Sequence, residues 1–226
     1  MAWTKILSGF WIVLTLGLPA WADGSSNTAP VKLPDFIPRD RGAPKNRVGA
    51  GSRGDDNQGQ YRNVAQLYVL APEQTGYTLS GNPVLYWYIS DPISQTVEIS
   101  ITDKLQDIFT LRINGIVHAG LQSLDLSLHR VELQPNVKYR WSIAIINNAE
   151  QRSADTFASA SIIRVADGNA LPPSYDSEQQ LANYFQQGIW YDAFSLVQTL
   201  AAKQPNEQIK AIRVRLLTLA NLPELN

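Results

Sequence analysis

The sequence of 226 residues predicts a mainly β protein, an antiparallel β-sandwich followed by a C-terminal region of α-helices. From about residue 63 to residue 170, short segments in which apolar and polar residues alternate are separated by turn residues, which is typical of sandwich strands. After Pro172-Pro173 the alternation stops, and apolar residues recur at helical spacing from about residue 175 to residue 226. The chain has no cysteine, so packing and not disulfide bonds must hold this fold together.

Residues 1–22 have the pattern of a secretory signal peptide. One early cation, Lys5, precedes an apolar run from residue 6 to residue 18, and a small-x-small cleavage pattern ends at Ala22. The run is shorter than the roughly 20 residues that a membrane-spanning helix needs. We therefore expect cleavage after Ala22, export to the periplasm or the exterior, and no transmembrane segment in the mature chain.

Residues 23–62 are rich in Gly, Pro and Arg and show no sustained apolar period, which predicts a linker that is either mobile or docked locally. A local basic cluster in this segment includes Arg47 and Arg53, two candidates for contact with an acidic partner. The alternative is a solvated linker, since Asp35, Asp40 and two further aspartates lie among the cations.

The same segment contains a G-x-G-x-x-G pattern at Gly49, Gly51 and Gly54. A dinucleotide site needs a strand before such a loop and a helix after it, whose N-terminal amides hold the pyrophosphate. Neither is predicted, and Asp55-Asp56 would place carboxylates beside the phosphates. We therefore expect no nucleotide cofactor.

Five segments of the middle region justify the strands. Residues 84–89 are apolar throughout and suit a central strand. The other four alternate, with one buried face each: Val97, Ile99 and Ile101; Phe109, Leu111 and Ile113; Leu124, Leu126 and Leu128; Tyr139, Trp141, Ile143 and Ile145.

The stretch LQPNVKYRWSI, residues 133–143, specifies the type of sandwich. Its L-x-P-x-x-x-Y-x-W spacing resembles fibronectin type III and related immunoglobulin-like domains. In that interpretation Tyr139 is a tyrosine corner, whose buried hydroxyl bonds to backbone a few residues upstream, and Trp141 follows on the same buried face.

Three helices are expected at the C-terminus. The first runs from residue 178 to residue 187, with Asp176 or Ser177 as its cap and Gly188 at its end. The second runs from about residue 191 to residue 203, and the third from residue 207 to residue 220. Residues 184–205 resemble half of a tetratricopeptide repeat, in which Gly188 forms the turn, small Ala193 lets the helices approach and Pro205 ends the second helix. A lone repeat cannot form a solenoid, so we expect a helical hairpin packed on the sandwich.

Aromatic residues are the remaining feature of the sequence that could indicate a binding site. Tyr86, Trp87 and Tyr88 are adjacent, so both faces of one strand carry rings. The outward rings either lie under the hairpin, opposite Trp190 and Tyr191, or form a platform on which a sugar stacks. Tyr86, Tyr88, Trp190 and Tyr191 are therefore candidate partner-binding residues.

Catalytic and metal chemistry has little support. The two histidines, His118 and His129, show no spacing typical of a triad or zinc site and are expected on exposed loops. Arg152 and Asp155 predict a local ion pair. Carboxylates for a hydrolase could come from six acids, of which no pair stands out: Glu98, Asp103, Asp107, Asp125, Glu132 and Asp155. Without Lys5, 18 basic residues face 20 acidic ones, a balance that gives no field for nucleic acid.

Four blocks in order, GAPKNRVGAGSRG, LYWYI, YRWSIAII with QRSAD, and GIWYDAF, resemble the domain of unknown function 928 family, found mostly in cyanobacteria. The resemblance implies an exported sandwich with a helical tail and no established activity. Members often carry two cysteines in regions that here read Asp55-Asp56 and Asn147-Asn148, so a disulfide that fastens the glycine-rich segment would be missing.

The sequence thus favours an exported, non-enzymatic binding or interaction protein whose partner is an envelope protein or a polysaccharide. Neither a cofactor nor a metal is expected. A carbohydrate-binding module of the cell envelope is the first alternative, and it requires exposed rings that include Tyr86 or Tyr88. A carboxylate-dependent hydrolase is the second, and it requires two acids about 5 to 9.5 Å apart in a cleft.

Overall fold

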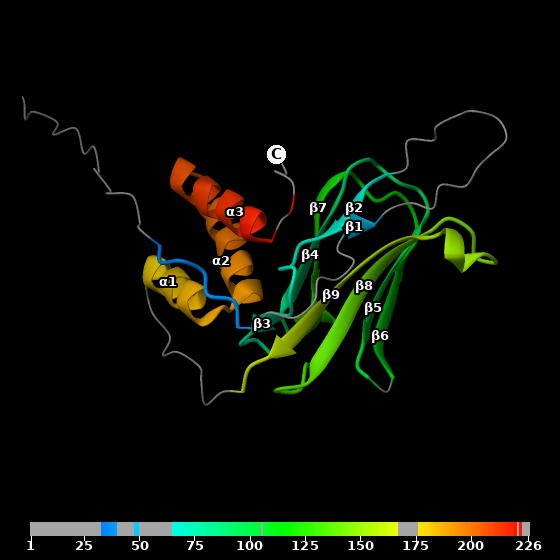
Figure 1. The fold of residues 1–226 in the computed structure, drawn as a ribbon. Helices are drawn as coiled ribbons and strands as arrows, with labels where there is room; N and C mark the ends of the chain where they lie inside the picture. Colours follow the sequence, from blue (N-terminus) through cyan, green and yellow to red (C-terminus); the bar gives the residue numbers. More distant parts are fainter. Residues whose placement is uncertain are drawn as a thin grey trace, which may run out of the picture. The chain divides into compact units, whose positions relative to one another are not determined.

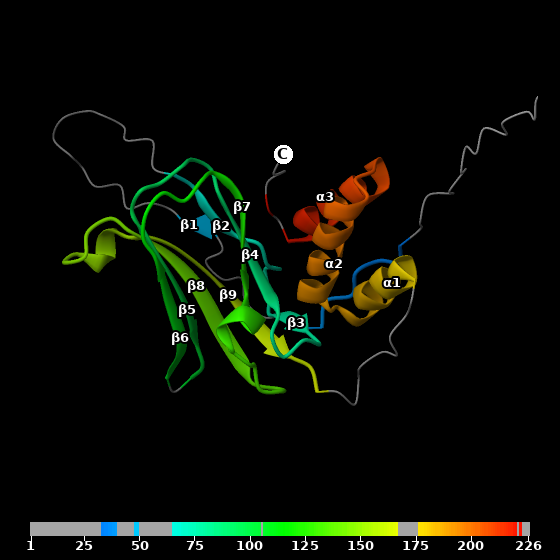
Figure 2. The ribbon, with the colours of Figure 1, turned by 180° about the vertical axis from the view of Figure 1, so that it is seen from behind.

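The computed structural model describes residues 33–39, 48–49, 65–104, 106–166, 176–220 and 222. Over these residues the protein is mainly β, with two sheets and three C-terminal helices (Figures 1 and 2). The four-stranded sheet has the order β1-β2-β4-β7, formed by Val48–Gly49, Leu67–Val69, Val84–Ile89 and Gly120–Asp125. The five-stranded sheet has the order β3-β9-β8-β5-β6, formed by Gly76–Thr78, Thr156–Arg164, Lys138–Ile146, Thr96–Thr102 and Asp107–Ile113.

Alternation along the strands produces the core between the two sheets. Leu85, Trp87 and Ile89 of β4 are buried there, and β4 lies between β2 and β7, as expected of an apolar central strand. Tyr139, Trp141, Ile143 and Ile145 of β8 face them from the other sheet. The sheets are antiparallel except for one pair, because β3 runs parallel to β9.

One expected strand ends early. The alternation of Leu124, Leu126 and Leu128 predicted a single strand, but β7 ends at Asp125 and a 3₁₀ helix, η1 (Leu126–His129), follows. The Asp125 carboxylate accepts a hydrogen bond from the backbone N–H of Ser127 at 2.9 Å and caps that helix. Leu126 is buried while Leu128 is 80% exposed, so the prediction of a shared buried face is wrong for Leu128.

Tyr139 makes the hydrogen bond expected of a tyrosine corner. Its ring is buried, and its hydroxyl oxygen accepts a hydrogen bond of 3.1 Å from the backbone N–H of Gln134, five residues upstream. Asn136 between them adopts a positive φ of 62°, so the chain turns tightly there. The contact fixes the loop that enters β8.

The helices α1 (Ser177–Gln187), α2 (Trp190–Lys203) and α3 (Glu207–Leu219) match the expected ones to within one residue at each end. Asp176 caps α1 by accepting from the N–H of Glu178 at 2.9 Å. Gly188 ends α1 with a φ of 65°, a left-handed conformation that favours glycine. Ala193 is fully buried on α2, and Pro205 lies just beyond its end.

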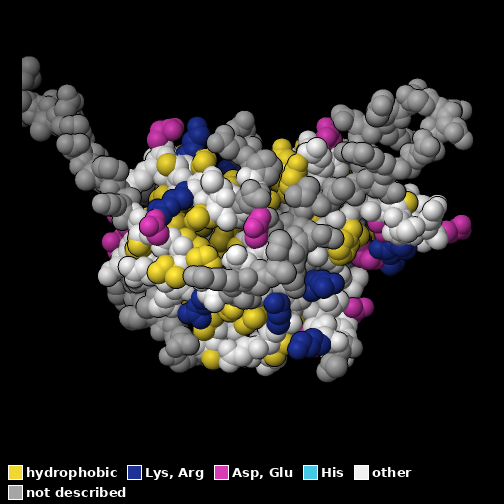
Figure 3. All heavy atoms as spheres, in the orientation of Figure 1, with side chains coloured by type: hydrophobic (Ala, Val, Ile, Leu, Met, Phe, Trp, Pro, Cys, Tyr) yellow, Lys and Arg dark blue, Asp and Glu magenta, His cyan; other side chains and the backbone are white. Residues whose placement is uncertain are grey.

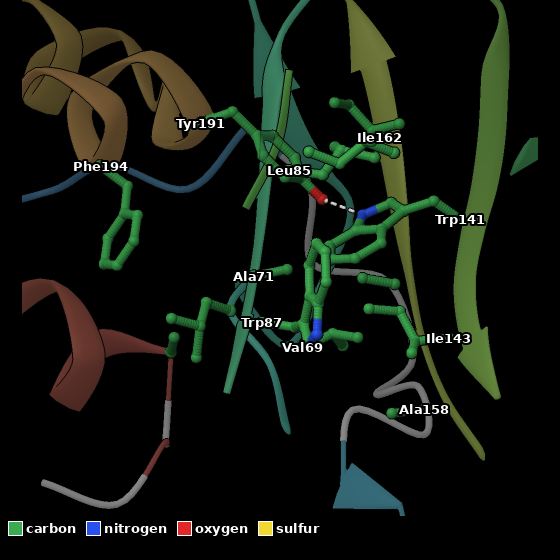
Figure 4. Packing of buried hydrophobic residues seen from close by; sticks show 14 of the residues in the cluster. Val69, Ala71, Leu85, Trp87, Trp141, Ile143, Ala158, Ile162, Tyr191 and Phe194 are labelled. Atoms are coloured by element: carbon green, nitrogen blue, oxygen red, sulfur yellow. Dashed lines mark hydrogen bonds between the residues drawn. The ribbon is translucent and has the colours of Figure 1, made fainter. Parts of the chain in front are cut away.

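Helix α2 packs against the strands β3 and β4. Figure 4 shows its Tyr191 pointing toward Trp141 of β8, whose indole N–H donates a hydrogen bond of 2.8 Å to the Tyr191 hydroxyl. That hydroxyl donates in turn to the backbone oxygen of Ser161 at 3.3 Å. On the outward face of β4, the ring of Tyr86 meets Phe194 edge to face at 5.2 Å. The hairpin therefore covers this part of β4, as expected.

Residues 33–39, which belong to the predicted linker segment, form a strap that is docked on the helices. Leu33 is buried, and Phe36 meets the ring of Phe185 edge to face at 5.7 Å. The guanidinium of Arg215 on α3 donates to the backbone oxygens of Leu33 and Pro34. Apolar contacts and captured backbone oxygens hold this segment, although it is too short to show a period.

The other N-terminal predictions lie mostly outside the described residues. These are the signal peptide at residues 1–22, Arg47, Arg53 and the second and third glycines of the G-x-G-x-x-G pattern. Its first glycine, Gly49, belongs to β1, which pairs antiparallel with β2. Within the described part of the chain, no helix has the length and apolar character needed to cross a membrane.

Candidate functional site

A polar cavity of about 280 Å³ lies on the face of the five-stranded sheet that points away from the core. It is bounded by β5, β8 and β9 and by the short 3₁₀ helix η2 (Arg152–Ala154), which follows β8. Figure 3 shows acidic and basic side chains side by side near this end of the sheet. The lining residues are Glu98, Ser100, Ser142, Ala144, Arg152, Ser153, Asp155 and Phe157.

The hollow exists because small side chains meet across three strands. The register places Ser100 of β5 opposite Ser142 of β8, and Ala144 of β8 between Glu98 and Phe157 on its two neighbours. All point outward, since they alternate with buried residues such as Ile99 and Ile143. Ser100 and Ser142 share a hydrogen bond of 2.7 Å, which fixes the floor of the cavity.

Ion pairs form the rim. One carboxylate oxygen of Glu98 accepts from Arg112 of β6 at 2.7 Å, and the other accepts from Arg152 at 2.8 Å. The Nε of Arg152 also donates to Asp155 at 2.6 Å, so the local ion pair expected from the sequence is present. The side chains of Glu98 and Asp155 are only 16% and 6% exposed, which strengthens these contacts relative to fully solvated pairs.

Backbone contacts hold η2 over the sheet. The second oxygen of Asp155 accepts a hydrogen bond from the backbone N–H of Asn147, and the amide of Asn147 donates to the backbone oxygen of Ala154 at 2.7 Å. The loop between β8 and β9 is thus closed on itself. Arg152 is therefore presented to Glu98 by a rigid turn.

The charged side chains of the cavity are held in ion pairs, so that carboxylates and guanidinium groups balance one another. Hydrogen bonding from Arg152 is the main factor that lowers the pKa of Glu98, opposed by partial burial, and Arg112 lowers it further. Hydrogen bonding to Glu98 likewise raises the pKa of Arg152. Glu98 therefore stays ionised near neutral pH, whereas a general acid needs a raised pKa. The geometry suits binding better than acid catalysis.

A second cavity, of about 220 Å³, lies where the hairpin meets the sandwich. Among the described residues, Asp192 of α2 is the only acid that lines it, beside residues that include Thr78, Tyr184 and Ser195. Burial raises the pKa of Asp192 and is also the largest factor in raising the pKa of Tyr184. The part of the chain that the structure describes thus contributes one carboxylate to this cavity, whereas a glycosidase uses a pair.

The contacts of Asp192 explain its position structurally. Its carboxylate accepts a hydrogen bond from the backbone N–H of Leu79 at 3.2 Å, and contacts with Thr78 and Ser80 also favour its charged form. These residues form the turn after β3. The carboxylate therefore ties α2 to that turn, and we assign it a role in docking the hairpin.

The predicted partner-binding residues fall into two groups. Trp190 and Tyr191 are buried, so they hold the hairpin on the sandwich, and the prediction that they bind a partner is wrong for this structure. Tyr86 is half-buried, packs on Phe194 and receives a hydrogen bond from Ser195 at 3.4 Å. Tyr88 is half-buried beside Tyr68, with their ring centres 6.4 Å apart.

The remaining candidate residues are not brought together. His118 and His129 are both exposed, as expected of loop residues, although His129 lies in η1 beside Phe109. No cluster of three or more possible metal ligands occurs among the described residues. Of the six acids considered for a hydrolase, only Glu98 and Asp155 line the cavity.

The floor of the cavity was not identified from the sequence. Ser100, Ser142 and Ala144 occupy ordinary outward positions of alternating strands, and such positions are normally polar or small. Glu98 and Arg152 were noticed separately, but nothing in a local window joins residues 54 positions apart. Once the strand pairing is assumed, small residues that face each other across two strands and are flanked by opposite charges are the signal that could have identified the site.

Comparison with known proteins identifies a family. The family model described as Domain of Unknown Function (DUF928) matches residues 48–226, which confirms the resemblance seen in the sequence. No curated protein matches the chain. Among solved structures, an engineered protein of a structural genomics consortium is similar at 8% identity, with a TM-score of 0.31. That likeness covers 45% of this chain and 20% of the engineered one.

Proposed function

The chain belongs to the DUF928 family, whose description gives no function, and we propose that it is an exported, non-enzymatic binding protein. The sequence pattern of residues 1–22 supports export, and the geometry of the polar cavity supports binding. The binding site is the polar cavity formed by β5, β8, β9 and η2. We also propose the finer assignments made from the sequence: a signal peptide at residues 1–22, and a sandwich of immunoglobulin or fibronectin III type at residues 63–170. The hydrogen bond from Gln134 to Tyr139 supports the type of sandwich.

One observation carries the binding proposal. The cavity combines a rigid floor of hydroxyl groups with a rim of charges that are already paired, so it presents many fixed hydrogen-bonding groups on a strand scaffold. Sites of this kind recognise a ligand without reorganising.

The charge states argue against hydrolysis at the same place. A hydrolase of the two-carboxylate type needs one acid that is protonated near neutral pH. Here both Glu98 and Asp155 contact the guanidinium of Arg152, and the pKa of Glu98 is lowered. The pair is therefore suited to accepting hydrogen bonds.

The test is retention on the cell envelope. Protein would be purified from cells expressing residues 1–226 and mixed with sedimented envelope material of the native source. Wild type is compared with Ala144→Leu, which fills the hollow without removing a charge, and with Ala119→Leu, a matched control at an exposed residue just before β7 that does not line the cavity. Thermal unfolding of each variant shows that it is folded.

We expect wild type and Ala119→Leu to sediment with the envelope and Ala144→Leu to stay in solution. Equal retention of all three would remove the cavity from the proposal. Export is tested on the same material, because N-terminal sequencing of the purified protein should begin at Asp23. A chain that still begins at Met1 would contradict the signal peptide.

A further inference from the structure

We propose that the polar cavity holds one ring of a neutral saccharide, with Glu98, Arg152 and the Ser100–Ser142 pair contacting its hydroxyl groups and Phe157 contacting its apolar face. This inference rests on the proposed function of the cavity as a binding site. It differs from the platform expected at Tyr86 and Tyr88, since Tyr86 packs against Phe194 of the hairpin.

The charges favour an uncharged ligand. The carboxylates of Glu98 and Asp155 are balanced by the guanidinium groups of Arg112 and Arg152, all within 2.8 Å of their partners. A phosphate or a carboxylate would add a negative charge to this balanced set, and an ammonium group would add a positive one. Neither would find an opposite charge that is not already paired, so a charged ligand gains little.

The hydrogen-bonding groups match hydroxyls. A sugar hydroxyl both donates and accepts, so it can donate to a carboxylate oxygen and accept from an adjacent guanidinium without displacing the ion pair. Arg152 uses two of its five N–H donors on Glu98 and Asp155 among the described residues. The two serine hydroxyls that share one hydrogen bond keep further accepting capacity at the floor.

Phe157 supplies an apolar wall. It lies across β8 from Glu98, with Ala144 between them, and its side chain is 42% exposed although it sits within a strand. An exposed ring beside fixed polar groups is an arrangement that binds a ligand with one apolar and one polar face. A pyranose ring has both.

The size of the cavity limits the contact with an oligosaccharide to one sugar ring. Its volume of about 280 Å³ lies just below the range of roughly 300 to 1,000 Å³ that is usual for drug-sized ligands. The cavity also opens to solvent at Arg152, whose side chain is 43% exposed. A single ring can therefore enter while the rest of an oligosaccharide remains outside.

The test is a titration followed by amide NMR shifts of the ¹⁵N-labelled protein. The probes are maltotriose, cellotriose, chitotriose and mannotriose, each up to about 20 mM, since binding by one ring is expected in the millimolar range. We expect at least one of them to shift the amides of Ser100, Ser142 and Ala144 in a saturable way. Inorganic phosphate and a neutral tripeptide, trialanine, serve as charged and peptide comparisons.

Variants separate the polar from the apolar contribution. Phe157→Ala is expected to weaken binding about three- to tenfold through loss of the ring contact. Glu98→Gln is expected to weaken it at least about fivefold, because a charged acceptor and an ion pair are lost. Glu132→Gln is the matched control, since it removes a charge from an ion pair with Arg164 that lies outside the cavity. The amide spectrum of each variant also reports that it is folded.

The outcomes distinguish the two proposals. Saturable shifts by phosphate or trialanine alone, or no shifts by any saccharide, would overturn the saccharide assignment. If Ala144→Leu still abolishes envelope retention in that case, the cavity remains a binding site for another ligand class. If Ala144→Leu is retained like wild type, the proposed function itself fails.

Discussion

Replacing Tyr191 with Phe should destabilise the protein, because it removes one buried hydroxyl that links α2 to two strands of the sandwich. That hydroxyl accepts from the indole N–H of Trp141 at 2.8 Å and donates to the backbone oxygen of Ser161 at 3.3 Å. All three residues are buried, so water cannot replace the lost partner. A buried donor left without an acceptor costs about 1 to 3 kcal/mol, and we expect a loss of that size in the free energy of unfolding.

The assay is urea unfolding followed by tryptophan fluorescence and by circular dichroism at 222 nm. For a protein of this length, each kcal/mol should also lower the Tm by roughly 2 to 4 °C. Tyr184→Phe is the control, because its hydroxyl accepts from Gln180 one turn away in the same helix, an interaction worth about 0.5 kcal/mol. If Tyr191→Phe were no less stable than Tyr184→Phe, the link between α2 and the sandwich would not have the strength argued here.

Three further changes test other parts of the structure. Gly188→Ala should lower the Tm by more than the roughly 2 to 4 °C that about 1 kcal/mol of left-handed backbone strain accounts for, because the new methyl group would also meet the backbone oxygen of Ile37. A smaller shift would argue against the strap. Glu98→Gln should destabilise at pH 7, and its difference from wild type should shrink as the pH falls below 4.5, because a lowered pKa contributes stability that is lost on protonation. Asp192 should have the opposite effect on how the free energy of unfolding changes with pH, since burial raises its pKa above 3.8 and its contribution to stability is lost as the pH rises through the raised value. Urea unfolding of Asp192→Asn at several pH values should lack this loss.

The secondary structure was largely predictable because its signals are local. Alternation in β5 and β8 and the caps of α1 at Asp176 and Gly188 each depend on residues a few positions apart. The prediction failed where a side chain redirected the backbone. Asp125 caps η1, and period-two apolar spacing continues through that cap although the strand has ended.

The candidate site was not predictable in the same way, because it depends on strand register. Glu98 and Arg152 meet only when β5 pairs with β8 and the loop after β8 folds back over the sheet. The hollow depends on Ser142 and Ala144 being small at the two positions that this register brings beside Ser100 and Glu98. A shift of one residue would turn these side chains into the core, so no window of the sequence contains the site.

Residues 184–205 resemble half of a tetratricopeptide repeat, and their packing is that of the hairpin expected on the sandwich, not of a peptide-binding array. Four large side chains of the hairpin, Phe185, Trp190, Tyr191 and Phe194, are fully buried. Repeat proteins bind through side chains that stacked helices leave on an open concave face. Here one hairpin covers part of β4 and contacts β3, so its rings close the core instead of presenting a groove. The outward side of the five-stranded sheet, which is hollowed between β5, β8 and β9, is where we propose that recognition takes place.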